Sequence, residues 1–410
     1  MQSMGKDHKE IGRELGLFSF SRKVPGTCYW WPKGNTLFNL IVEDLKVRLK
    51  DQGYQDITTS TIISLDTLKK SGHYDNYRDK LFFVSNEKEM DEKKVNWCLK
   101  PMNCPGSIII FNEEMRSYKE LPIKFSEVGT VYRYEQPGEV NGLFRTRALT
   151  IDDAHIYCNE DQIEPEIIKL IDFIYETYKR YGFEDISVEL STRPKKSIGT
   201  DEQWQKAESG LTKALEDAKI RYKENKGEGA FYGPKIDFHV KDSLNRSWQL
   251  GTIQLDFAMA ERLDANYIDK EGNKKYPVMI HRAILGSVER FIAVLLEHTA
   301  GALPVWLSPV QAVILPVSEK HIEYAKKVAK SAQGRSSSGR EIGKVRLEID
   351  DRNESINKKI RDAELQKIPY IIVVGDKEES EKNITVRERG KKELKKQTIE
   401  KFVELLIQLY

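Results

Sequence analysis

The sequence predicts an α+β protein in which a large N-terminal domain rich in antiparallel strands precedes a small α/β domain. Two pairs of apolar runs, each joined by a loop, predict hairpins in the first domain. After a proline-marked segment, short strands alternate with helices to the end of the chain. The hairpin strands are 124–135 with 145–155 and 231–240 with 247–257, and the proline-marked segment is 303–309. The length of 410 residues fits two or three domains, which we place at 1–303 and 304–410.

Helix and strand signals order the first domain. Apolar residues from Leu37 to Leu49 recur at the i, i+4 spacing of an amphipathic helix, which we place at 35–50. Asp7 is a suitable N-cap for a short helix before it, and Gly286 separates a short strand from a later helix. The other expected elements are a strand at 57–63, a solvated hairpin loop at 85–96, helices at 164–181 and 200–219, a strand at 278–281 and a helix at 287–298.

The second domain has the pattern of a small, mostly parallel sheet covered by helices. Strands are expected where β-branched residues cluster, and helices where apolar residues recur every three to four positions. The strands are 311–316, 345–349, 370–374 and 384–388, and the helices are 321–332, 353–365 and 395–409.

Composition excludes some classes of protein. The 66 Lys and Arg nearly balance the 64 Asp and Glu, so bulk charge alone does not hold this chain to nucleic acid. Binding of nucleic acid by a local basic face is not excluded by this balance. The four cysteines are scattered and show no disulfide framework, which favours a reducing compartment. No apolar run reaches membrane-spanning length, and no signal peptide is recognised. We therefore expect a cytoplasmic protein that does not bind membranes.

Three arginines mark the first hairpin as a candidate phosphate site. Arg133 lies near the end of the first strand, and Arg145 and Arg147 lie at the start of the second. Planar guanidinium groups match phosphate oxygens, so the hairpin is typical of a clamp on a polyphosphate. The alternative is that these arginines are solvated surface residues.

Cys104, His155 and His281 are candidate metal ligands on three separate segments. No short spacing such as Cys-x-x-Cys indicates zinc here. Taken singly, each residue could equally be a packed cysteine or a histidine satisfied by hydrogen bonds.

Longer motifs carry a resemblance to a known family. Pro101-Met-Asn-Cys-Pro-Gly106, Asp152-Asp-Ala-His155 and His281-Arg-Ala-Ile-Leu-Gly-Ser-Val-Glu-Arg290 resemble motifs of the threonyl-tRNA synthetases, which are class II aminoacyl-tRNA synthetases. The resemblance spans nearly the whole chain. It implies a class II antiparallel sheet flanked by helices, then an anticodon-binding domain, in a homodimer. We expect no N-terminal editing domain before Asp7.

The resemblance also implies roles for individual residues. Arg133 would contact the α-phosphate of ATP, Glu135 the adenine, Arg145 the outer phosphates, and Arg290 both the γ-phosphate and the adenine. ATP, with Mg²⁺, would be bound by Arg133, Glu135, Arg145, Gln249, Thr252, Ser287 and Arg290. The catalytic set would be Arg133, Arg290, His73 and Lys235, although His73 could instead be structural. The polar residues of 231–240 and 247–257 could also be solvated tips of core strands.

Cys104, His155 and His281 occupy the family's three zinc-ligand positions. Threonine would fill the open positions of Zn²⁺ with its amino and hydroxyl groups, which excludes valine. Threonine would further contact Met102, Asp153, Tyr232 and Gln254. Four residues depart from the common family pattern, and their effect on affinity is left open: Leu149, Ile151, Ser107 and Leu250.

The second domain resembles the anticodon-binding domain of this subgroup. Asn353, Glu378 and Arg387 would read unstacked anticodon bases of tRNA(Thr), although a solvated charged edge is the alternative. The chain is therefore interpreted as a threonine–tRNA ligase. Two rivals remain: a synthetase-like enzyme with another amino acid or acceptor, and a non-catalytic RNA-binding relative.

Overall fold

The computed structural model describes residues 6–92, 94–242, 245–333 and 345–409. The chain forms two compact units. The central unit comprises Phe20–Cys28 and Val42–Val294, and the terminal unit comprises Met1–Ser19, Tyr29–Ile41 and Leu295–Tyr410. The expected domains 1–303 and 304–410 stay a prediction. Among the described residues, no helix is both long and apolar enough to cross a membrane.

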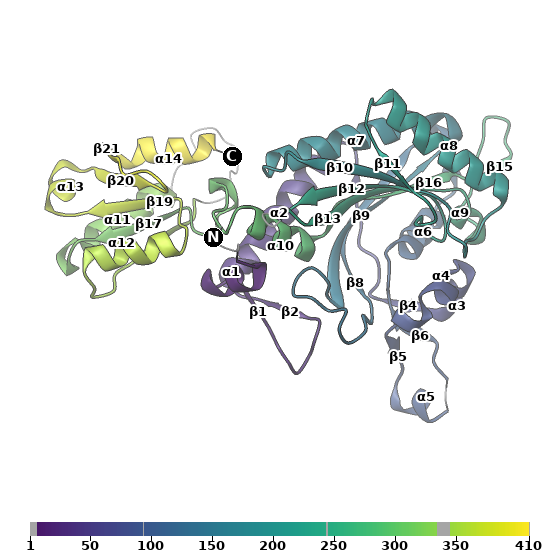
Figure 1. Cartoon of the computed structure of the whole chain (residues 1–410), viewed down its shortest axis with the longest axis horizontal. Coiled ribbons are helices and arrows are strands. Elements are labelled where there is room, and N and C mark those ends of the chain that lie inside the picture. Colours follow the sequence, from purple (N-terminus) through teal and green to yellow (C-terminus); the bar gives the residue numbers. More distant parts are fainter. Residues whose placement is uncertain (1–5, 93, 243–244, 334–344, 410) are drawn as a thin grey trace. The chain divides into compact units, whose positions relative to one another are not determined.

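An eight-stranded sheet organises the central unit, in the order β11-β10-β12-β13-β16-β9-β8-β3 (Figure 1). Its inner pairings are antiparallel and its two outermost pairings are parallel. This confirms the predicted antiparallel-rich α+β fold and both predicted hairpins. The strands are β3 (Gln55–Asp56), β8 (Ile123–Tyr132), β9 (Ala148–Cys158), β10 (Ile186–Ser191), β11 (Lys223–Asn225), β12 (Lys235–Lys241), β13 (Ser247–Asp256) and β16 (Val278–Ser287).

Two helices cover one face of this sheet, α7 (Ile163–Arg180) and α8 (Asp201–Asp217) (Figure 1). Their apolar stripes are buried, and the Tyr178 hydroxyl donates to the Ile284 carbonyl oxygen at 2.8 Å, which ties α7 to β16. Both helices were predicted and are confirmed, as are α2 (Pro32–Asp51) and α10 (Val288–His298). On the opposite face, Phe125, Tyr157 and Met279 belong to a separate buried hydrophobic cluster.

Smaller elements complete the central unit. The helices are α3 (Leu65–Lys70), α4 (His73–Tyr77), α5 (Glu87–Asp91), α6 (Cys104–Asn112) and α9 (Met259–Arg262). Two three-stranded sheets are β4 (Ile62–Ser64), β6 (Trp97–Leu99) and β5 (Phe83–Val84), and β15 (Lys274–Lys275), β14 (Tyr267–Ile268) and β7 (Arg116–Ser117). The strands β1 (Phe18–Phe20) and β2 (Cys28–Trp30) precede them in the chain.

The strand predicted at 57–63 is wrong. Only Ile62 and Ile63 of that run are in a strand. The Thr59 backbone N–H donates to the side-chain carboxylate of Glu127 at 2.9 Å instead of to a backbone carbonyl oxygen of a neighbouring strand. Lys100 Nζ donates to the same carboxylate at 2.8 Å. This buried polar network bends the chain away from the sheet.

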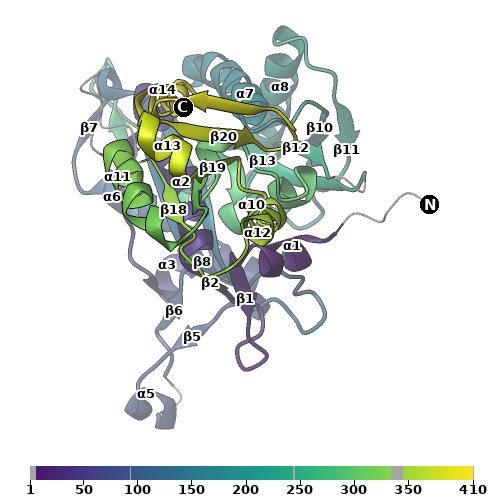
Figure 2. The same cartoon turned by 90° about the vertical axis from the view of Figure 1, so that its left-hand side faces the viewer.

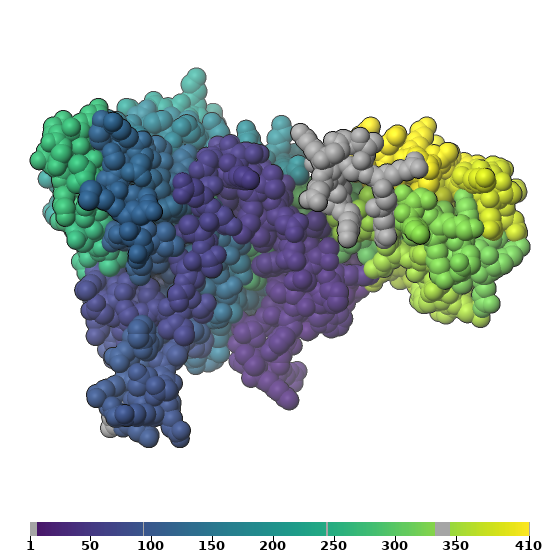
Figure 3. Space-filling model, turned by 180° about the vertical axis from the view of Figure 1, so that it is seen from behind, coloured from purple at the N-terminus to yellow at the C-terminus, as the bar shows by residue number. Residues whose placement is uncertain are grey.

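Two further predictions need adjustment. The strand expected at 278–281 is longer and continues to Ser287. The loop expected at 85–96 does connect antiparallel strands, but it contains the helix α5, capped by Asn86. In Figure 3 this hairpin projects from the central unit as a narrow blue lobe.

The terminal unit contains a five-stranded sheet in the order β18-β17-β19-β20-β21 (Figures 1 and 2). Helices α11 and α14 pack on one face and α12 on the other. The elements are α1 (His8–Glu14), β17 (Ala312–Pro316), α11 (Ile322–Gln333), β18 (Leu347–Ile349), α12 (Ile356–Leu365), β19 (Tyr370–Val374), α13 (Asp376–Glu381), β20 (Ile384–Glu388), β21 (Leu394–Gln397) and α14 (Ile399–Gln408).

The expectation of a mostly parallel sheet is confirmed in part. β18, β17 and β19 run parallel, but β20 and β21 pair antiparallel. The helix predicted at 395–409 begins only at Ile399, because Leu394–Gln397 first forms the edge strand β21. Asp7 does cap α1, since its side chain accepts from the Glu10 backbone N–H.

Candidate active site

One face of the large sheet forms a cavity of about 450 Å³. Along β9 the lining residues alternate, because successive side chains of a strand point to opposite faces. Leu149, Ile151, Asp153 and His155 point into the cavity in this way. The predicted site residues that line it are Met102, Cys104, Arg133, Asp153, His155, Tyr232, Lys235, Gln249, Thr252, Gln254, His281, Ser287 and Arg290.

Two irregularities in the sheet aim further side chains at this cavity. β13 carries an extra residue between Gln249 and Thr252, so both line the cavity despite their odd spacing. β16 bulges between Ala283 and Ser287. Gly286 within this bulge has φ of +71°, and a Cβ there would lie 2.6 Å from the Leu250 carbonyl oxygen, so only glycine fits.

Cys104, His155 and His281 meet at one end of the cavity. A ligand atom of each lies within 4.8 Å of the others, and all three side chains are buried. His155 and His281 are directly opposite each other on β9 and β16, and Cys104 begins α6. The register of the sheet therefore assembles residues that are far apart in the sequence.

The donor atoms of this cluster fit a zinc ion. His155 Nε2 is buried and has no hydrogen-bond partner among the described residues. Burial lowers the pKa of His155 well below its ordinary value, so the ring is neutral and keeps a free lone pair. One sulfur and two imidazole nitrogens form a three-ligand set typical of zinc sites with an open position.

Asp153 lies beside the metal cluster, where its carboxylate can meet a cationic group. Burial raises the pKa of Asp153, whereas the nearby His281 and Arg282 lower it. Asn103 Nδ2 donates to Asp153 Oδ2 at 3.3 Å from a side chain with no exposure to solvent. The sequence analysis missed Asn103, whose only signal was its place before Cys104.

Arginines occupy the other end of the cavity. Arg133 Nε donates to the Pro101 carbonyl oxygen at 3.0 Å, and Arg290 donates to the carbonyl oxygens of Phe144 and Gln249 at 3.1 and 3.2 Å. Burial lowers the pKa of Arg290, and the charges of Arg145 and Arg133 lower it further. These guanidinium groups repel one another and would be stabilised by an anion between them.

Glu135 and Arg145 do not line the cavity. Glu135 Oε2 accepts from Arg145 Nε and from Lys80 Nζ, each at 3.1 Å. Arg145 Nη2 also lies 3.5 Å from Glu139 Oε1. Glu135 and Arg145, which were both predicted to contact the nucleotide, are thus hydrogen-bonded to each other.

A buried carboxylate that the sequence analysis missed links three predicted site residues. Asp237 accepts from Lys235 Nζ at 2.5 Å, from Gln249 Nε2 at 2.5 Å and from Thr252 Oγ1 at 2.9 Å. Ser191 Oγ donates to it at 2.9 Å from the other side. The alternation of β12 puts Asp237 on the same face as Lys235, which was the available signal.

The remaining predicted residues lie around the metal cluster. Tyr232 hydrogen-bonds Gln254, and its ring centroid is 4.9 Å from that of His281. His73 is buried behind the cavity wall, with Nε2 3.2 Å from Met102 Sδ and 3.3 Å from Cys104 Sγ. It lies next to the cluster without lining the cavity.

Three of the four unusual residues lie on the cavity wall. Leu149, Ile151 and Leu250 line it, so a ligand would meet their apolar side chains there. Ser107 is buried elsewhere and shares a 2.8 Å hydrogen bond with the Tyr157 hydroxyl. Ser107 therefore does not form part of the cavity surface.

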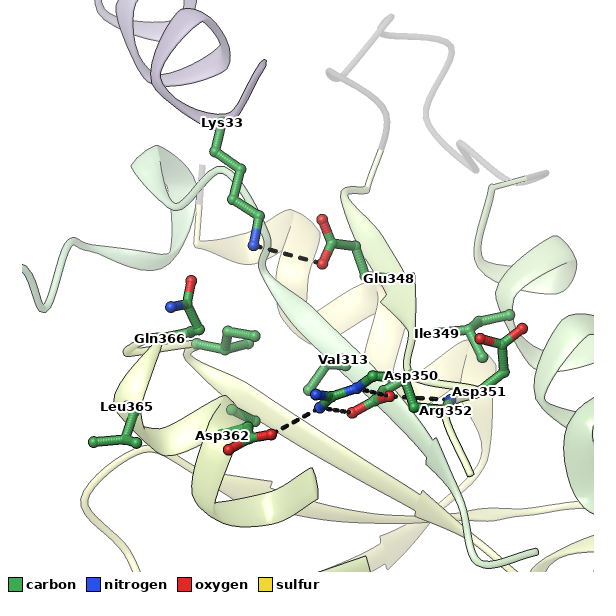
Figure 4. A pocket seen from close by; sticks show the side chains of 12 residues that line it. Lys33, Val313, Glu348, Ile349, Asp350, Asp351, Arg352, Asp362, Leu365 and Gln366 are labelled. Atoms are coloured by element: carbon green, nitrogen blue, oxygen red, sulfur yellow. Dashed lines mark hydrogen bonds and ion pairs between the residues drawn. The ribbon is translucent and has the colours of Figure 1, made fainter. Parts of the chain in front are cut away.

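In the terminal unit, a hollow of about 490 Å³ is lined mainly by charged residues (Figure 4). Arg352 Nη2 lies 2.7 Å from Asp350 and 2.9 Å from Asp362, and Lys33 lies 3.7 Å from Glu348. The carboxylates of Glu348, Asp350, Asp351 and Asp362 outnumber the cations of Lys33 and Arg352, so the hollow keeps a net negative charge that disfavours an anionic ligand.

The predicted anticodon residues occupy different places in this unit. Asn353 lines a second hollow of about 450 Å³ at the carboxyl ends of the parallel strands. Glu378 accepts from Thr385 Oγ1 at 2.8 Å, and Arg387 Nη2 lies 2.6 Å from Glu364 Oε1. Neither Glu378 nor Arg387 lines that hollow.

Comparison with known proteins agrees with this geometry. The family model described as tRNA synthetase class II core domain (G, H, P, S and T) matches residues 82–299, and the model of an anticodon binding domain matches residues 311–409. Threonine–tRNA ligase from Caldanaerobacter subterraneus is 46% identical over 98% of this chain, and that from Desulforamulus reducens is 48% identical over 94%. The chain spans 60% and 58% of their lengths.

A solved structure covers the same extent as this chain. The crystal structure described as the RNA binding domain of threonyl-tRNA synthetase from Cryptosporidium parvum superposes with a TM-score of 0.92 and 40% identity, over 98% of each chain. The family model covers more than half of the chain, and this relative is matched over nearly its whole length. The chain therefore belongs to the class II aminoacyl-tRNA synthetases, within the threonyl-tRNA synthetase family.

Proposed function

We propose that this chain joins threonine to tRNA(Thr) at the expense of ATP. The observation that carries the proposal is a single cavity with a buried Cys–His–His cluster at one end and partly buried arginines at the other. The first end suits an amino acid with a hydroxyl group, and the second suits a polyphosphate. Family membership supports the same assignment.

The reaction has two steps. In the first, a threonine carboxylate oxygen attacks the α-phosphorus of ATP, and pyrophosphate leaves with the electrons of the broken P–O bond. Arg133 and Arg290 stabilise the negative charge that develops on the phosphates, and Mg²⁺ accompanies the nucleotide. In the second, a hydroxyl of the terminal tRNA ribose attacks the threonyl carbonyl carbon, and AMP leaves. His73, behind the cavity wall, is the proposed aid to this transfer.

The amino-acid subsite is built from the cluster and Asp153. A zinc ion held by Cys104, His155 and His281 would act as a Lewis acid for the amino and hydroxyl groups of threonine. Asp153 would accept a hydrogen bond from the substrate amine, and Met102, Tyr232 and Gln254 would enclose the side chain. Lys235, Gln249, Thr252 and Ser287 would enclose the adenylate.

Amino-acid-dependent pyrophosphate exchange tests the proposal. With each of the twenty amino acids in turn, threonine should support the fastest exchange. Serine lacks only a methyl group, which is worth ~1–3 kcal/mol, whereas valine lacks the hydroxyl that the polar subsite reads and should be rejected much more strongly. Exchange supported best by a different amino acid would identify the first rival function, and no exchange with any amino acid would identify the non-catalytic one.

Asp237→Asn tests whether the buried carboxylate organises the nucleotide end. We expect the KM for ATP to rise by roughly 5- to 150-fold, because donors left without an acceptor cost ~1–3 kcal/mol. The KM for threonine should change much less, since Lys235, Gln249 and Thr252 are the side chains released. Equal increases in both constants would contradict this role.

In the terminal unit, Asn353, Glu378 and Arg387 are the proposed anticodon contacts. Their separation over the surface fits recognition of several unstacked nucleotides by different parts of one domain. Arg387 would have to exchange its ion pair with Glu364 for a base or a phosphate. We also propose that the chain forms a homodimer. Sedimentation analysis of the purified chain measures its oligomeric state.

A further inference from the structure

Asp256 lies directly behind one of the three clustered residues. Its Oδ2 is 3.1 Å from His281 Nε2, and neither side chain has more than 5% of its surface exposed. The two residues stand on neighbouring strands, Asp256 at the end of β13 and His281 on β16. This contact occupies Nε2 of His281, which leaves Nδ1 as the other ring nitrogen.

Asp256 is itself fixed by the backbone. Its Oδ1 accepts from the N–H groups of Ala258 at 2.7 Å and of Met259 at 3.0 Å, where α9 begins. With Oδ1 occupied in this way, Oδ2 is held toward the imidazole. Asp256 cannot rotate without leaving two buried N–H groups unsatisfied, which is costly.

The hydrogen bond decides which nitrogen of His281 can bind a metal. A carboxylate oxygen only accepts, so the proton between the two side chains belongs to Nε2. A neutral imidazole protonated on Nε2 carries its lone pair on Nδ1. His155, by contrast, presents Nε2, the buried atom for which the described residues offer no hydrogen-bond partner. The two histidines therefore offer opposite ring nitrogens to the cluster.

We infer that Asp256 is a positioning residue of the metal site: it fixes the tautomer and the orientation of His281, so that Nδ1 binds the ion. Carboxylates that hold a ligating histidine in this way strengthen metal binding. The inference rests on the metal site of the proposed function and adds a residue outside the three ligands. Asp256 is not among the residues that line the cavity.

Asp256→Asn separates this role from simple capping of α9. The amide has nearly the same shape, and its oxygen can still accept from the N–H groups of Ala258 and Met259. In that orientation its NH₂ group faces His281 Nε2, which favours the tautomer protonated on Nδ1 and blocks the ligand atom. We expect the zinc dissociation constant of the full chain, measured by competition with a chromophoric chelator, to rise by ~10- to 100-fold.

A matched control is Asp269→Asn. Asp269 Oδ1 also accepts from two backbone N–H groups, those of Glu271 and Asn273, at 3.0 and 2.8 Å. Among the described residues, no histidine is hydrogen-bonded to Asp269. This variant should bind zinc like the unsubstituted chain. After chelation, the Asp256→Asn chain should unfold at nearly the same temperature as the zinc-free unsubstituted chain, whereas added zinc should stabilise it less at equal concentration.

The outcomes are distinguishable. Zinc bound equally tightly by the Asp256→Asn and unsubstituted chains would overturn the role of Asp256 while leaving the metal site in place. A loss of affinity accompanied by an equal loss of stability in the zinc-free variant would assign Asp256 to capping alone and also overturn the inference. Failure of the unsubstituted chain to bind zinc would overturn the metal site of the proposed function itself, and this inference with it.

Discussion

Replacement of Cys104 by alanine is expected to remove zinc and to weaken the preference for threonine over valine. A subsite that reads a hydroxyl through polar contacts discriminates by 10⁴ or more, whereas a purely apolar pocket manages only ~10² between side chains of equal shape. Without the thiolate, only His155 and His281 remain of the cluster. The ratio of threonine to valine activation should therefore fall by ~10²-fold, measured as kcat/KM in pyrophosphate exchange together with metal content.

Cys158→Ala is the matched control for this prediction. Cys158 is also fully buried and is on β9 three residues beyond His155, but its sulfur contacts the Val278 carbonyl oxygen at 3.7 Å and it is not part of the cluster. This variant should retain zinc and specificity even if it loses some stability. A Cys104→Ala chain that kept both zinc and the threonine preference would refute the proposed metal site.

Replacement of Arg290 by alanine is expected to slow adenylate formation by roughly 30- to 1000-fold. The guanidinium would contact phosphates whose charge grows during the reaction, and loss of such a contact costs ~2–4 kcal/mol. Arg290 is already held by the carbonyl oxygens of Phe144 and Gln249, so little ordering remains to be done when ATP binds. The measurement is threonine-dependent pyrophosphate exchange at varied ATP, which separates kcat from KM.

Arg262→Ala provides the comparison for Arg290→Ala. Arg262 likewise donates from Nε to a backbone carbonyl oxygen, that of Lys70, at 2.8 Å, but it is exposed and does not line the cavity. Exchange by this variant should stay within about twofold of the unsubstituted rate, since surface substitutions usually change stability by no more than ~0.5 kcal/mol. Near-normal exchange by a folded Arg290→Ala chain would remove Arg290 from the reaction.

Much of the fold follows from periodicity, and each wrong prediction has an identifiable cause. The helices α2, α7 and α8 were predicted because each buries one long apolar stripe. Such a stripe is visible in the sequence as apolar residues that recur every three to four positions. The run 57–63 has the β-branched composition of a strand, but Thr59 hydrogen-bonds Glu127, a residue far away in the sequence. The edge strand β21 is rich in lysine and carries little apolar signal, so a helix was predicted in its place.

For the site, the sequence by itself determined which residue types are available and, through the family motifs, which of them to group. Only the tertiary structure decided their relations: the register that sets His155 opposite His281, and the bulges that aim Gln249 and Ser287 into the cavity. The supporting residues Asn103, Asp237 and Asp256 came from the structure alone. Many of their hydrogen-bond partners lie on other segments of the chain, and such bonds leave no period in a single sequence.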